Sequence, residues 1–328
     1  MHVREAVLEI LEQNKGTEYP GAELARMLGV SRNAVWKAVQ ELKKKGYPIE
    51  AVGKKGYCLS GESDILSPQS IGFWLSDFKT PLQFEVYEEV PSTNTILKQK
   101  AEAGAPEGLV CVANRQTMGK GRLGRSFYSP PDTGIYMSIL LRPTLLAQDA
   151  LLITTAAAVA VARVIETASG RPAQIKWVND VYCDGRKVCG ILTEASMNFE
   201  SGGLAYAVLG IGINIAPPAG GFPEEISSIA TALFGENAHV SGIRSRLTAE
   251  ICRAFFELYT KLPDKTFMEE YRSRSFLIGC DVDVLSPGGS RPAHVLDIDA
   301  DANLVVRFAD GAVQSLSSGE VSVRRRST

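Results

Sequence analysis

We infer the fold class first from the glycine loop, which reads Gln116-Thr117-Met118-Gly119-Lys120-Gly121-Arg122-Leu123-Gly124-Arg125. Its glycines have the Gly-x-Gly-x-x-Gly spacing of dinucleotide-binding folds. Those folds need a helix to start at the loop, so that the helix N-terminus meets a pyrophosphate. Here Phe127-Tyr128-Ser129-Pro130-Pro131 follows, and prolines beside turn-forming residues do not continue a helix. A doubly wound nucleotide-binding sheet is therefore excluded, and the absence of a Gly-Lys-Ser/Thr sequence excludes a P-loop.

The glycine loop instead combines flexible backbone with positive charge. Its glycines allow the backbone to approach a ligand closely. Lys120, Arg122 and Arg125 can neutralise a phosphate or a carboxylate. The alternative is a solvent-exposed basic loop without a ligand.

Around this loop, strand-like and helix-like segments do not alternate regularly. We expect a helix that begins at Ser92 or Thr93 and a long Ala-rich core helix over 151–168. Apolar runs that predict strands lie at 84–87, 109–113, 135–141, 175–177, 188–192 and 205–213. This order predicts an α+β domain with a mostly antiparallel sheet.

Two further segments carry candidate ligand-binding residues. Lys176-Trp177-Val178-Asn179-Asp180 precedes a predicted hairpin that leads to Lys187 at the edge of an apolar strand. A lysine there can place a point charge over a ligand, although it could equally be a solvated hairpin charge. Gly210-Ile211-Gly212-Ile213-Asn214 is a strand end with small residues, where a flat ligand could approach.

The N-terminal sixty residues carry a net charge of +3, whereas the remainder carries −5. Leu24, Ala25 and Leu28 predict a short helix, Gly29 a turn, and Ser31 the cap of a third helix. This is the layout of a helix–turn–helix, and a hairpin with a basic tip follows as a wing. The residues expected to contact DNA are Ser31, Arg32, Asn33, Lys37, Lys54 and Lys55. We expect Trp36 in the core or in an interface; a merely structural three-helix domain is the alternative.

Composition limits the remaining possibilities. The chain has 328 residues, 45% of them apolar and 22% charged, which favours two or three globular domains over disorder. The apolar stretch 150–162 is shorter than the roughly 20 residues of a membrane span. Six scattered cysteines without a Cys-x-x-Cys pair and three distant histidines indicate neither a disulfide scaffold nor a zinc site. A charged N-terminus argues against a signal peptide, so we expect a cytoplasmic protein without membrane contact.

The C-terminal segment is predicted to be a small β domain. Strand-like runs lie at 281–285, 294–298, 304–308, 313–316 and 321–323, and Gly- and Asp-rich turns separate them. They predict an SH3-like β barrel. The expected domains are 1–63, a winged helix–turn–helix; 64–275, a catalytic domain; and 276–328, the barrel.

Taken in order, these motifs resemble the biotin protein ligase family. The resemblance rests on Ser92-Thr93-Asn94, the glycine loop, 176–180, 186–192 and 210–214. The winged helix in front and the β domain behind resemble the members of the family that are both ligase and biotin operon repressor. The resemblance implies a central catalytic domain of the class II synthetase-like type.

The resemblance also implies a two-step reaction. The carboxylate of biotin attacks the α-phosphate of ATP with the help of Mg²⁺, and a lysine of a biotin carboxyl carrier protein then accepts biotin from biotinyl-5'-AMP. By motif position, biotin is bound by Ser92, Thr93, Asn94, Gln116, Lys120, Gly121, Arg122 and Lys187, of which Lys187 and Arg122 are catalytic. The residues expected to bind ATP and the adenylate are Gly119, Arg125, Lys176, Asn179, Asp180 and Asn214. Of these, Asp180 is also expected to bind the metal. As a repressor, the chain would use the adenylate as corepressor and bind operator DNA as a homodimer.

Two other functions fit the residues. One is a ligand-sensing transcription factor without ligase activity, although sensing needs no cluster of anion-neutralising cations. The other is a ligase for lipoate or octanoate, against which the polar Ser92-Thr93-Asn94 cap argues weakly. The chain departs from the family at Lys120, where arginine is common, and lysine lacks the two-pronged guanidinium. We also expect the glycine loop to order over the reactive adenylate and exclude water.

Overall fold

The computed structural model describes residues 2–146, 149–198, 202–235, 242–286, 289–317 and 322–325. By internal packing the chain divides into two compact units. Unit one comprises Met1–Lys79 and Asn237–Glu250, and unit two comprises Thr80–Glu236 and Ile251–Thr328. Helix α8 (Ile243–Tyr259) runs through the division. The three-domain boundaries at 63 and 275 stay predictions.

Unit one begins with the predicted three helices, α1 (Val3–Gln13), α2 (Gly21–Leu28) and α3 (Arg32–Lys44). Their apolar stripes meet in one core that contains Leu11, Leu24 and Leu42. The turn before α3 forms as expected, because Gly29 has a φ of 63° and the Ser31 hydroxyl accepts a hydrogen bond from the Ala34 N–H at 3.1 Å. The helix–turn–helix is therefore confirmed.

A hairpin of β1 (Ile49–Val52) and β2 (Gly56–Leu59) follows α3, with a short 3₁₀ turn at Gly53–Lys55. Tyr57 pairs with Tyr19 through backbone hydrogen bonds of 2.8 and 2.9 Å. Gly56 has a φ of 113°, and a Cβ there would lie 2.0 Å from the Tyr19 carbonyl oxygen, so only glycine fits. Helix α4 (Pro68–Phe73) ends the first stretch of unit one.

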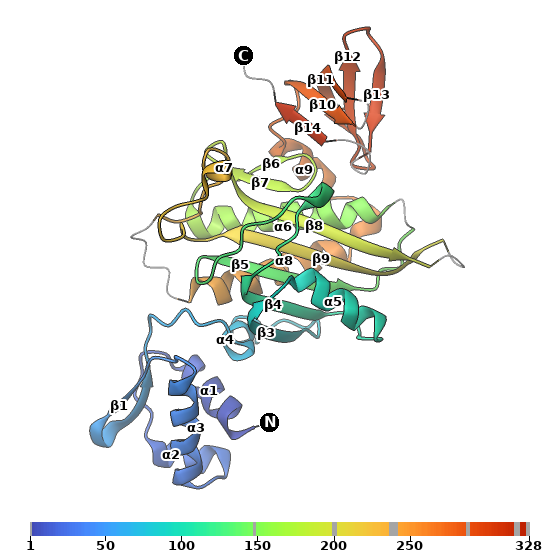
Figure 1. Cartoon of the computed structure of the whole chain (residues 1–328). Coiled ribbons are helices and arrows are strands. Elements are labelled where there is room, and N and C mark those ends of the chain that lie inside the picture. Colours follow the sequence, from blue (N-terminus) through green and yellow to red (C-terminus); the bar gives the residue numbers. More distant parts are fainter. Residues whose placement is uncertain are drawn as a thin grey trace. The chain divides into compact units, whose positions relative to one another are not determined.

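The centre of unit two is a seven-stranded sheet in the order β3-β4-β5-β9-β8-β7-β6 (Figure 1). Its strands are β3 (Gln83–Val90), β4 (Leu109–Gln116), β5 (Gly134–Leu141), β6 (Gln174–Lys176), β7 (Asp180–Cys183), β8 (Arg186–Met197) and β9 (Leu204–Asn214). The β3–β4 pair is parallel and the other pairs are antiparallel. The predicted α+β class with a mostly antiparallel sheet is confirmed.

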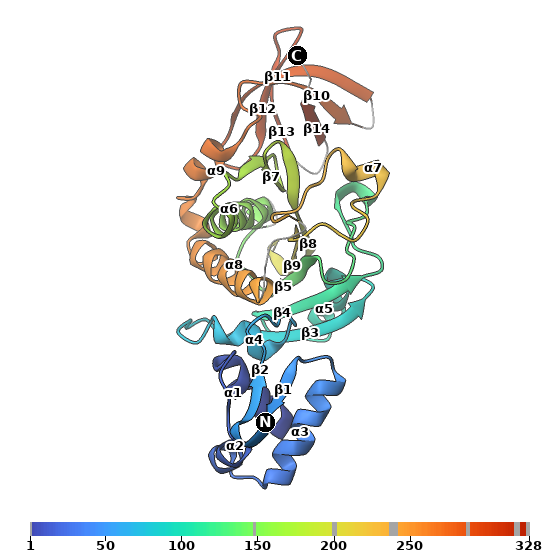
Figure 2. The ribbon, with the colours of Figure 1, turned by 90° about the vertical axis from the view of Figure 1, so that its left-hand side faces the viewer.

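Helices cover both faces of this sheet, with α6 (Ala150–Ser169) and α9 (Met268–Arg274) on one face and α5 (Thr93–Glu102) on the other (Figure 2). Helix α6 is longer than the charge-free apolar stretch of the sequence, because it continues past Arg163 and Glu166. It is the one described helix long and apolar enough to cross a membrane, but 72% of its most apolar window is buried inside the protein. Such burial is typical of a core helix. Shorter elements are α7 (Glu224–Ser227) and the 3₁₀ turns Arg122–Gly124 and Leu262–Asp264.

The C-terminal strands form a separate five-stranded antiparallel sheet in the order β13-β12-β11-β10-β14. Their bounds are β10 (Asp281–Ser286), β11 (Gly289–Ile298), β12 (Leu304–Phe308), β13 (Val313–Leu316) and β14 (Ser322–Arg325). Each strand lies where the sequence predicted one. The closure of this sheet into an SH3-like barrel stays a prediction.

Candidate active site and nucleic-acid interface

Unit two contains a cavity of about 950 Å³ that brings together segments far apart in the sequence. Of the residues predicted to bind biotin, ATP or the adenylate, those that line it are Ser92, Thr93, Asn94, Gln116, Lys120, Gly121, Arg122, Arg125, Lys176, Asn179, Asp180, Lys187 and Asn214. Gly119 does not line the cavity. A Cβ on Gly119 would lie 2.4 Å from the Phe127 carbonyl oxygen, so this glycine serves the packing of the loop.

One end of the cavity is neutral and polar. Ser92 is the N-cap residue of α5, and Thr93 and Asn94 form its first turn, all three nearly buried. Gln116 at the end of β4 accepts a hydrogen bond from the Thr93 N–H at 2.9 Å. Its amide donates to the Ser129 hydroxyl at 3.0 Å. These bonds hold hydroxyl and amide groups, which suit a neutral ring with both donors and acceptors, at one place.

Glycines of β8 and β9 line the floor of the cavity, the part between its two ends. A Cβ on Gly210 would lie 2.2 Å from Asn94 Oδ1, and one on Gly212 would lie 2.6 Å from the Phe127 ring. On the neighbouring strand, a Cβ on Gly190 would lie 3.1 Å from Lys187 Nζ. The small residues at 210–214 were predicted to let a ligand approach the strand. In this structure the side chains of Asn94 and Phe127 approach it there instead. Phe127 was not predicted as a cavity residue, although its aromatic side chain two residues after the glycine loop is a usable signal.

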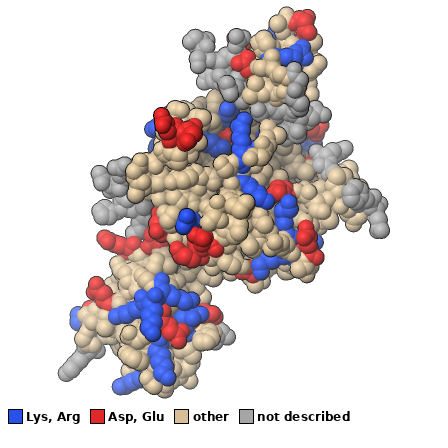
Figure 3. Space-filling model, viewed as in Figure 1, with Lys and Arg blue, Asp and Glu red and all other residues tan. Residues whose placement is uncertain are grey.

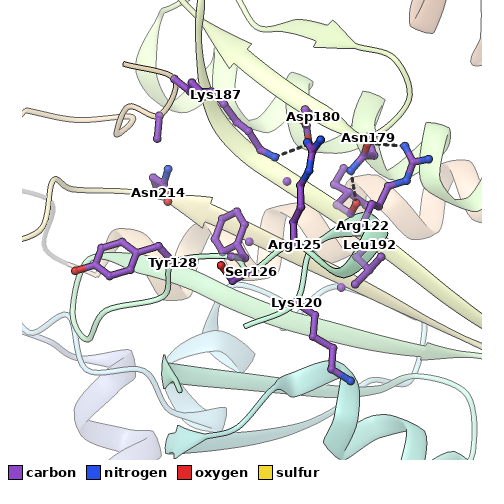
Figure 4. A pocket seen from close by; sticks show the side chains of 18 of the residues that line it. Lys120, Arg122, Arg125, Ser126, Tyr128, Asn179, Asp180, Lys187, Leu192 and Asn214 are labelled. Carbon is purple, nitrogen blue, oxygen red and sulfur yellow. Dashed lines mark hydrogen bonds and ion pairs between the residues drawn. The ribbon is translucent and has the colours of Figure 1, made fainter. Parts of the chain in front are cut away.

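The other end of the cavity carries charge. Lys187 at the start of β8 extends toward Asp180 of β7, and Lys187 Nζ lies 2.7 Å from Asp180 Oδ1 (Figure 4). The backbone of Lys187 is also held, because its N–H donates to the Ile229 carbonyl at 2.8 Å and its carbonyl accepts from the Thr231 N–H at 2.9 Å. The backbone of Lys187 is therefore held in place, and Asp180 is the counter-ion of its ammonium group at the cavity wall.

Arg122 lies beside this pair and reaches Asn179, whose Oδ1 accepts from Arg122 Nη1 at 3.1 Å (Figure 4). Burial lowers the pKa of the Arg122 guanidinium, and the negative charge of Asp180 opposes that shift. Asn179 in turn donates to the Ile191 carbonyl at 2.7 Å. A guanidinium that is removed from bulk water in this way interacts more strongly with an anion than an exposed one does.

The other two cations of the glycine loop point in different directions in Figure 4. Arg125 extends toward the Lys187–Asp180 pair, whereas Lys120 points away from it. The loop between them is a folded turn, in which the Gly121 N–H donates to the Arg125 carbonyl at 2.7 Å. The loop thus directs Arg125, but not Lys120, toward the charged end of the cavity.

The outer wall of the charged end has a partly apolar lining from Phe222, Ile226 and Ile229. Asn214 donates to the Thr231 carbonyl at 3.1 Å, which ties the end of β9 to this segment. Lys176 lies 6.0 Å from the centre of the Tyr182 ring. The segment 226–230 was missed in the sequence analysis, because nothing in its composition indicates a ligand.

The donor set around Asp180 limits the kind of metal that fits. Across the described residues, no group of three or more His, Cys, Asp or Glu side chains could hold a metal ion. Mg²⁺ bound with a nucleotide needs only one or two protein carboxylates, because phosphates and waters complete its shell. Asp180 therefore fits Mg²⁺ that arrives with ATP, and the described residues do not fit a resident metal.

In unit one, α3 presents Arg32, Asn33 and Lys37 to solvent, and Lys and Arg side chains gather on the face of this unit seen in Figure 3. Trp36 is 51% exposed, so it does not lie in the core, and the alternative expectation of an interface position stays a prediction. It lies on the same helix as the basic residues, off the buried stripe of Val35, Ala38, Val39 and Leu42.

The other residues predicted to contact DNA differ in whether their side chains already have partners within the protein. The Ser31 hydroxyl is engaged as the helix cap. Lys55 on the hairpin tip is exposed and lies 3.2 Å from Glu18 Oε2. The side chain of Lys54 lies outside the described part of the structure.

Known proteins are similar to this chain in both units. Residues 86–214 match the biotin/lipoate A/B protein ligase family, and residues 3–58 match a helix–turn–helix domain family. The bifunctional ligase/repressor BirA of Bacillus spizizenii is 34% identical over 98% of both chains. The biotin--[acetyl-CoA-carboxylase] ligase of Mycobacterium tuberculosis is 32% identical over 73% of this chain and 88% of its own.

The fold comparison agrees. The biotin protein ligase from Aquifex aeolicus in complex with biotin and ATP superposes with a TM-score of 0.61 at 28% identity, over 74% of this chain and 99% of that one. Similarity to a bifunctional relative over nearly the whole length, with matches to both component families, decides the assignment. The chain belongs to the bifunctional ligase/repressor family, in which a helix–turn–helix domain precedes a biotin/lipoate protein ligase domain.

Proposed function

We propose that the chain is an ATP-dependent biotin protein ligase and a biotin-responsive repressor. The observation that carries the ligase activity is the single cavity with a neutral polar end and a cationic end. Biotin has the same division, with a neutral cyclic urea at one end and a carboxylate at the other. Thr93 and Gln116 suit the urea, and Lys187 and Arg122 suit the carboxylate.

The first step joins two anions. A carboxylate oxygen of biotin attacks the α-phosphorus of ATP, the bond from this phosphorus to the bridging oxygen breaks, and pyrophosphate leaves with biotinyl-5'-AMP formed. Lys187 and Arg122 offset the repulsion between carboxylate and phosphate as the two approach. Asp180 holds Lys187 in place until the substrates provide other negative charge. Mg²⁺ held by Asp180 and the phosphates would supply further charge neutralisation.

In the second step the neutral amine of a lysine on a carrier protein attacks the acyl carbon of the mixed anhydride. An amide bond forms, AMP leaves, and the amine loses a proton. The anhydride must be shielded from water until the lysine arrives, which is the role we assign to the glycine loop. We propose the biotin carboxyl carrier protein of acetyl-CoA carboxylase as the acceptor and the cytoplasm as the location.

The test of the ligase uses the full chain, a carrier domain, biotin and MgATP, with the mass of the carrier as readout. Lys187→Met is expected to reduce adenylate formation by about 10²- to 10³-fold, the usual loss when one charge-stabilising group is removed. Lys261→Met, an exposed lysine elsewhere in unit two, is the matched control and should leave the rate unchanged. A wild-type chain that leaves the carrier unmodified and releases no pyrophosphate would refute the ligase.

The repressor activity rests on unit one. Arg32, Asn33 and Lys37 are exposed on α3, which we assign as the recognition helix, and we propose that they contact base edges and phosphates. One such helix reads only a half-site, so we propose a homodimer on a two-fold operator. As support, residues 192–197 of β8 pair only with β9 among the described residues, and an open strand edge is a surface on which chains pair.

We propose further that bound biotinyl-5'-AMP promotes this dimer and so acts as corepressor. Sedimentation of the chain with and without adenylate, together with operator binding by fluorescence anisotropy, tests this. We expect tighter operator binding and a dimer when the adenylate is present. Equal operator affinity in both states would refute regulation by the adenylate and leave the ligase intact.

A further inference from the structure

The exposed face of α3 carries one large aromatic side chain. Trp36 is 51% exposed, although tryptophan side chains are highly buried on average. Among the described residues, the Trp36 indole has no hydrogen bond, no stacked ring and no cation above it. Val35, Val39 and Leu42 on the other side of α3 pack into the core of unit one without it. The indole therefore contributes little to the packing of this unit.

The neighbours of Trp36 on the helix surface are residues predicted to contact DNA. Residues three and four positions apart lie side by side on a helix, so Trp36 adjoins Asn33 and Arg32. Lys37 follows directly in the sequence, and all four side chains are exposed. The Ser31 hydroxyl caps the helix, which places these residues in its first two turns. The N-terminal part of a recognition helix is the part that contacts base edges.

The charge around Trp36 indicates which kind of partner covers it. Helix α3 has four basic residues and one acidic residue, Glu41, which lies 3.5 Å from Arg4. A protein that covered the indole would also remove water from Arg32 and Lys37, and lysine is depleted in protein–protein interfaces. DNA instead offers a phosphate to each of these charges. Charge complementarity therefore favours DNA as the partner.

The chemistry of the major groove then limits what the indole can contact. This groove admits an α-helix, and its base edges present hydrogen-bond donors, hydrogen-bond acceptors and one kind of apolar group, the 5-methyl group of thymine. Arginine and asparagine side chains bind guanine and adenine there through hydrogen bonds. The apolar surface of the Trp36 ring has the thymine methyl group as its matching partner, and contact with it removes exposed apolar surface from water.

We propose that Trp36 is a specificity-determining residue of the repressor, and that its indole packs against the 5-methyl group of a thymine in the major groove of the operator. This inference rests on the proposed repressor function and is independent of the ligase. Uracil has the same hydrogen-bonding groups as thymine and lacks only this methyl group. Replacement of thymine by uracil therefore isolates the contact that we assign to Trp36.

The test uses the full-length chain and a duplex that the wild type selects from a random DNA pool in the presence of biotin and MgATP. Each thymine of this duplex is replaced in turn by uracil, and the Kd of the dye-labelled duplex is measured by fluorescence anisotropy. For the wild type, uracil at the contacted position should raise the Kd about 3- to 5-fold, the value of one buried methyl group. Trp36→Ala should bind the uracil and thymine duplexes equally.

Three variants separate specificity from affinity. Trp36→Ala should raise the Kd for the selected duplex about 10- to 100-fold, with the Kd for a random duplex within about 2-fold of the wild type because the phosphate contacts remain. Its thermal midpoint should be that of the wild type, since the side chain is exposed. Trp36→Phe should keep part of the thymine dependence, because a phenyl ring also contacts the methyl group. Trp74→Phe changes a tryptophan of unit one that is 42% exposed outside α3, and as the matched control it should bind like the wild type.

Tryptophan emission gives a signal that a merely structural role would not change. The chain has three tryptophans, of which Trp177 is buried. The selected duplex should shift the emission of the wild type and protect it from quenching by acrylamide. Trp36→Phe should abolish most of both effects, whereas Trp74→Phe should preserve them.

The outcomes are distinct. If every uracil replacement weakens binding of the wild type and of Trp36→Ala equally, the indole does not contact a thymine methyl group, and the proposal is overturned. It is also overturned if Trp36→Ala keeps the thymine dependence and instead weakens self-association in sedimentation without DNA, because the indole then lies in a protein interface. In both cases specific DNA binding by the wild type would still support the proposed repressor. A wild type that selects no duplex from the pool would overturn the repressor and this inference together.

Discussion

Gly210→Ala gives the most direct test of how the cavity floor is built. Gly210 lies on β9, paired with Ser138 of β5. A Cβ on this residue would lie 2.2 Å from Oδ1, 2.9 Å from Cγ and 3.1 Å from Nδ2 of Asn94. Asn94 cannot easily withdraw, because its amide is bonded to Glu194 and Leu192 and its oxygen to Ser138. One methyl group must therefore displace a buried, fully bonded side chain.

The cost can be estimated from two contributions. Overpacking of a core costs about 1–3 kcal/mol, and a buried polar group that loses its partner costs about 1–3 kcal/mol more. Together these contributions are about 2–6 kcal/mol, and at roughly 2–4 °C per kcal/mol for a domain of this size we expect the thermal midpoint to fall by about 4–24 °C. The biotin Kd should also rise, because Asn94 no longer orients Ser138.

Differential scanning calorimetry of the full-length chain measures this shift. Gly235→Ala is the matched control, since a Cβ there meets nothing within 4 Å, and its midpoint should equal that of the wild type. If Gly210→Ala melts with the control and binds biotin normally, Asn94 is not held as the distances require, and our account of the polar end is wrong.

Four further experiments test other parts of the molecule. Lys37→Ala should weaken operator binding and reduce its salt slope by about one, whereas Lys44→Ala at the end of α3 should have a smaller effect; equal slopes would contradict our placement of α3. Lys120→Arg should slow release of the adenylate a few-fold in a chase experiment, because arginine adds a second prong. Trypsin should cut the glycine loop more slowly when biotin and ATP are bound, and equal cleavage would contradict closure. Trp177→Phe removes the indole N–H that bonds Ala302, at a cost of about 1–3 kcal/mol, and should raise the KM for ATP more than that for biotin.

The fold could be predicted from the sequence wherever apolar periodicity is local. Each predicted strand of the central sheet is found, and the residue before the third helix, Ser31, caps it as its chemistry predicts. The ends of the strands were less predictable, since β8 runs over Arg186–Met197 and not only over the apolar part at 188–192. Polar positions such as Glu194 continue the strand because backbone pairing with β9, not side-chain hydropathy, maintains it.

Most residues predicted for the site line the cavity, but the orientations of their side chains could not be predicted from the sequence. Motif spacing identifies Lys187 and Asp180 as candidates, and only the register of β7 against β8 shows that they form an ion pair. The burial of Trp36 could not be predicted either. An aromatic residue in a helix is usually buried, and only the placement of the stripe reveals that this one is exposed. Glu194 was not predicted because a lone glutamate in a strand gives no signal until its partners are known.

The C-terminal sheet has a role in the site that composition does not reveal. The turn between β6 and β7 ends at Asn179, directly before Asp180 of β7, and both side chains line the charged end of the cavity. The Trp177 indole N–H donates at 2.8 Å to the carbonyl of Ala302, in the turn between β11 and β12, and the Tyr271 hydroxyl donates to the Val178 carbonyl at 3.0 Å. Both bonds are buried. The turn is therefore held by α9 and by the C-terminal segment as well as by β8, so residues that do not line the cavity help to determine where its charged end lies.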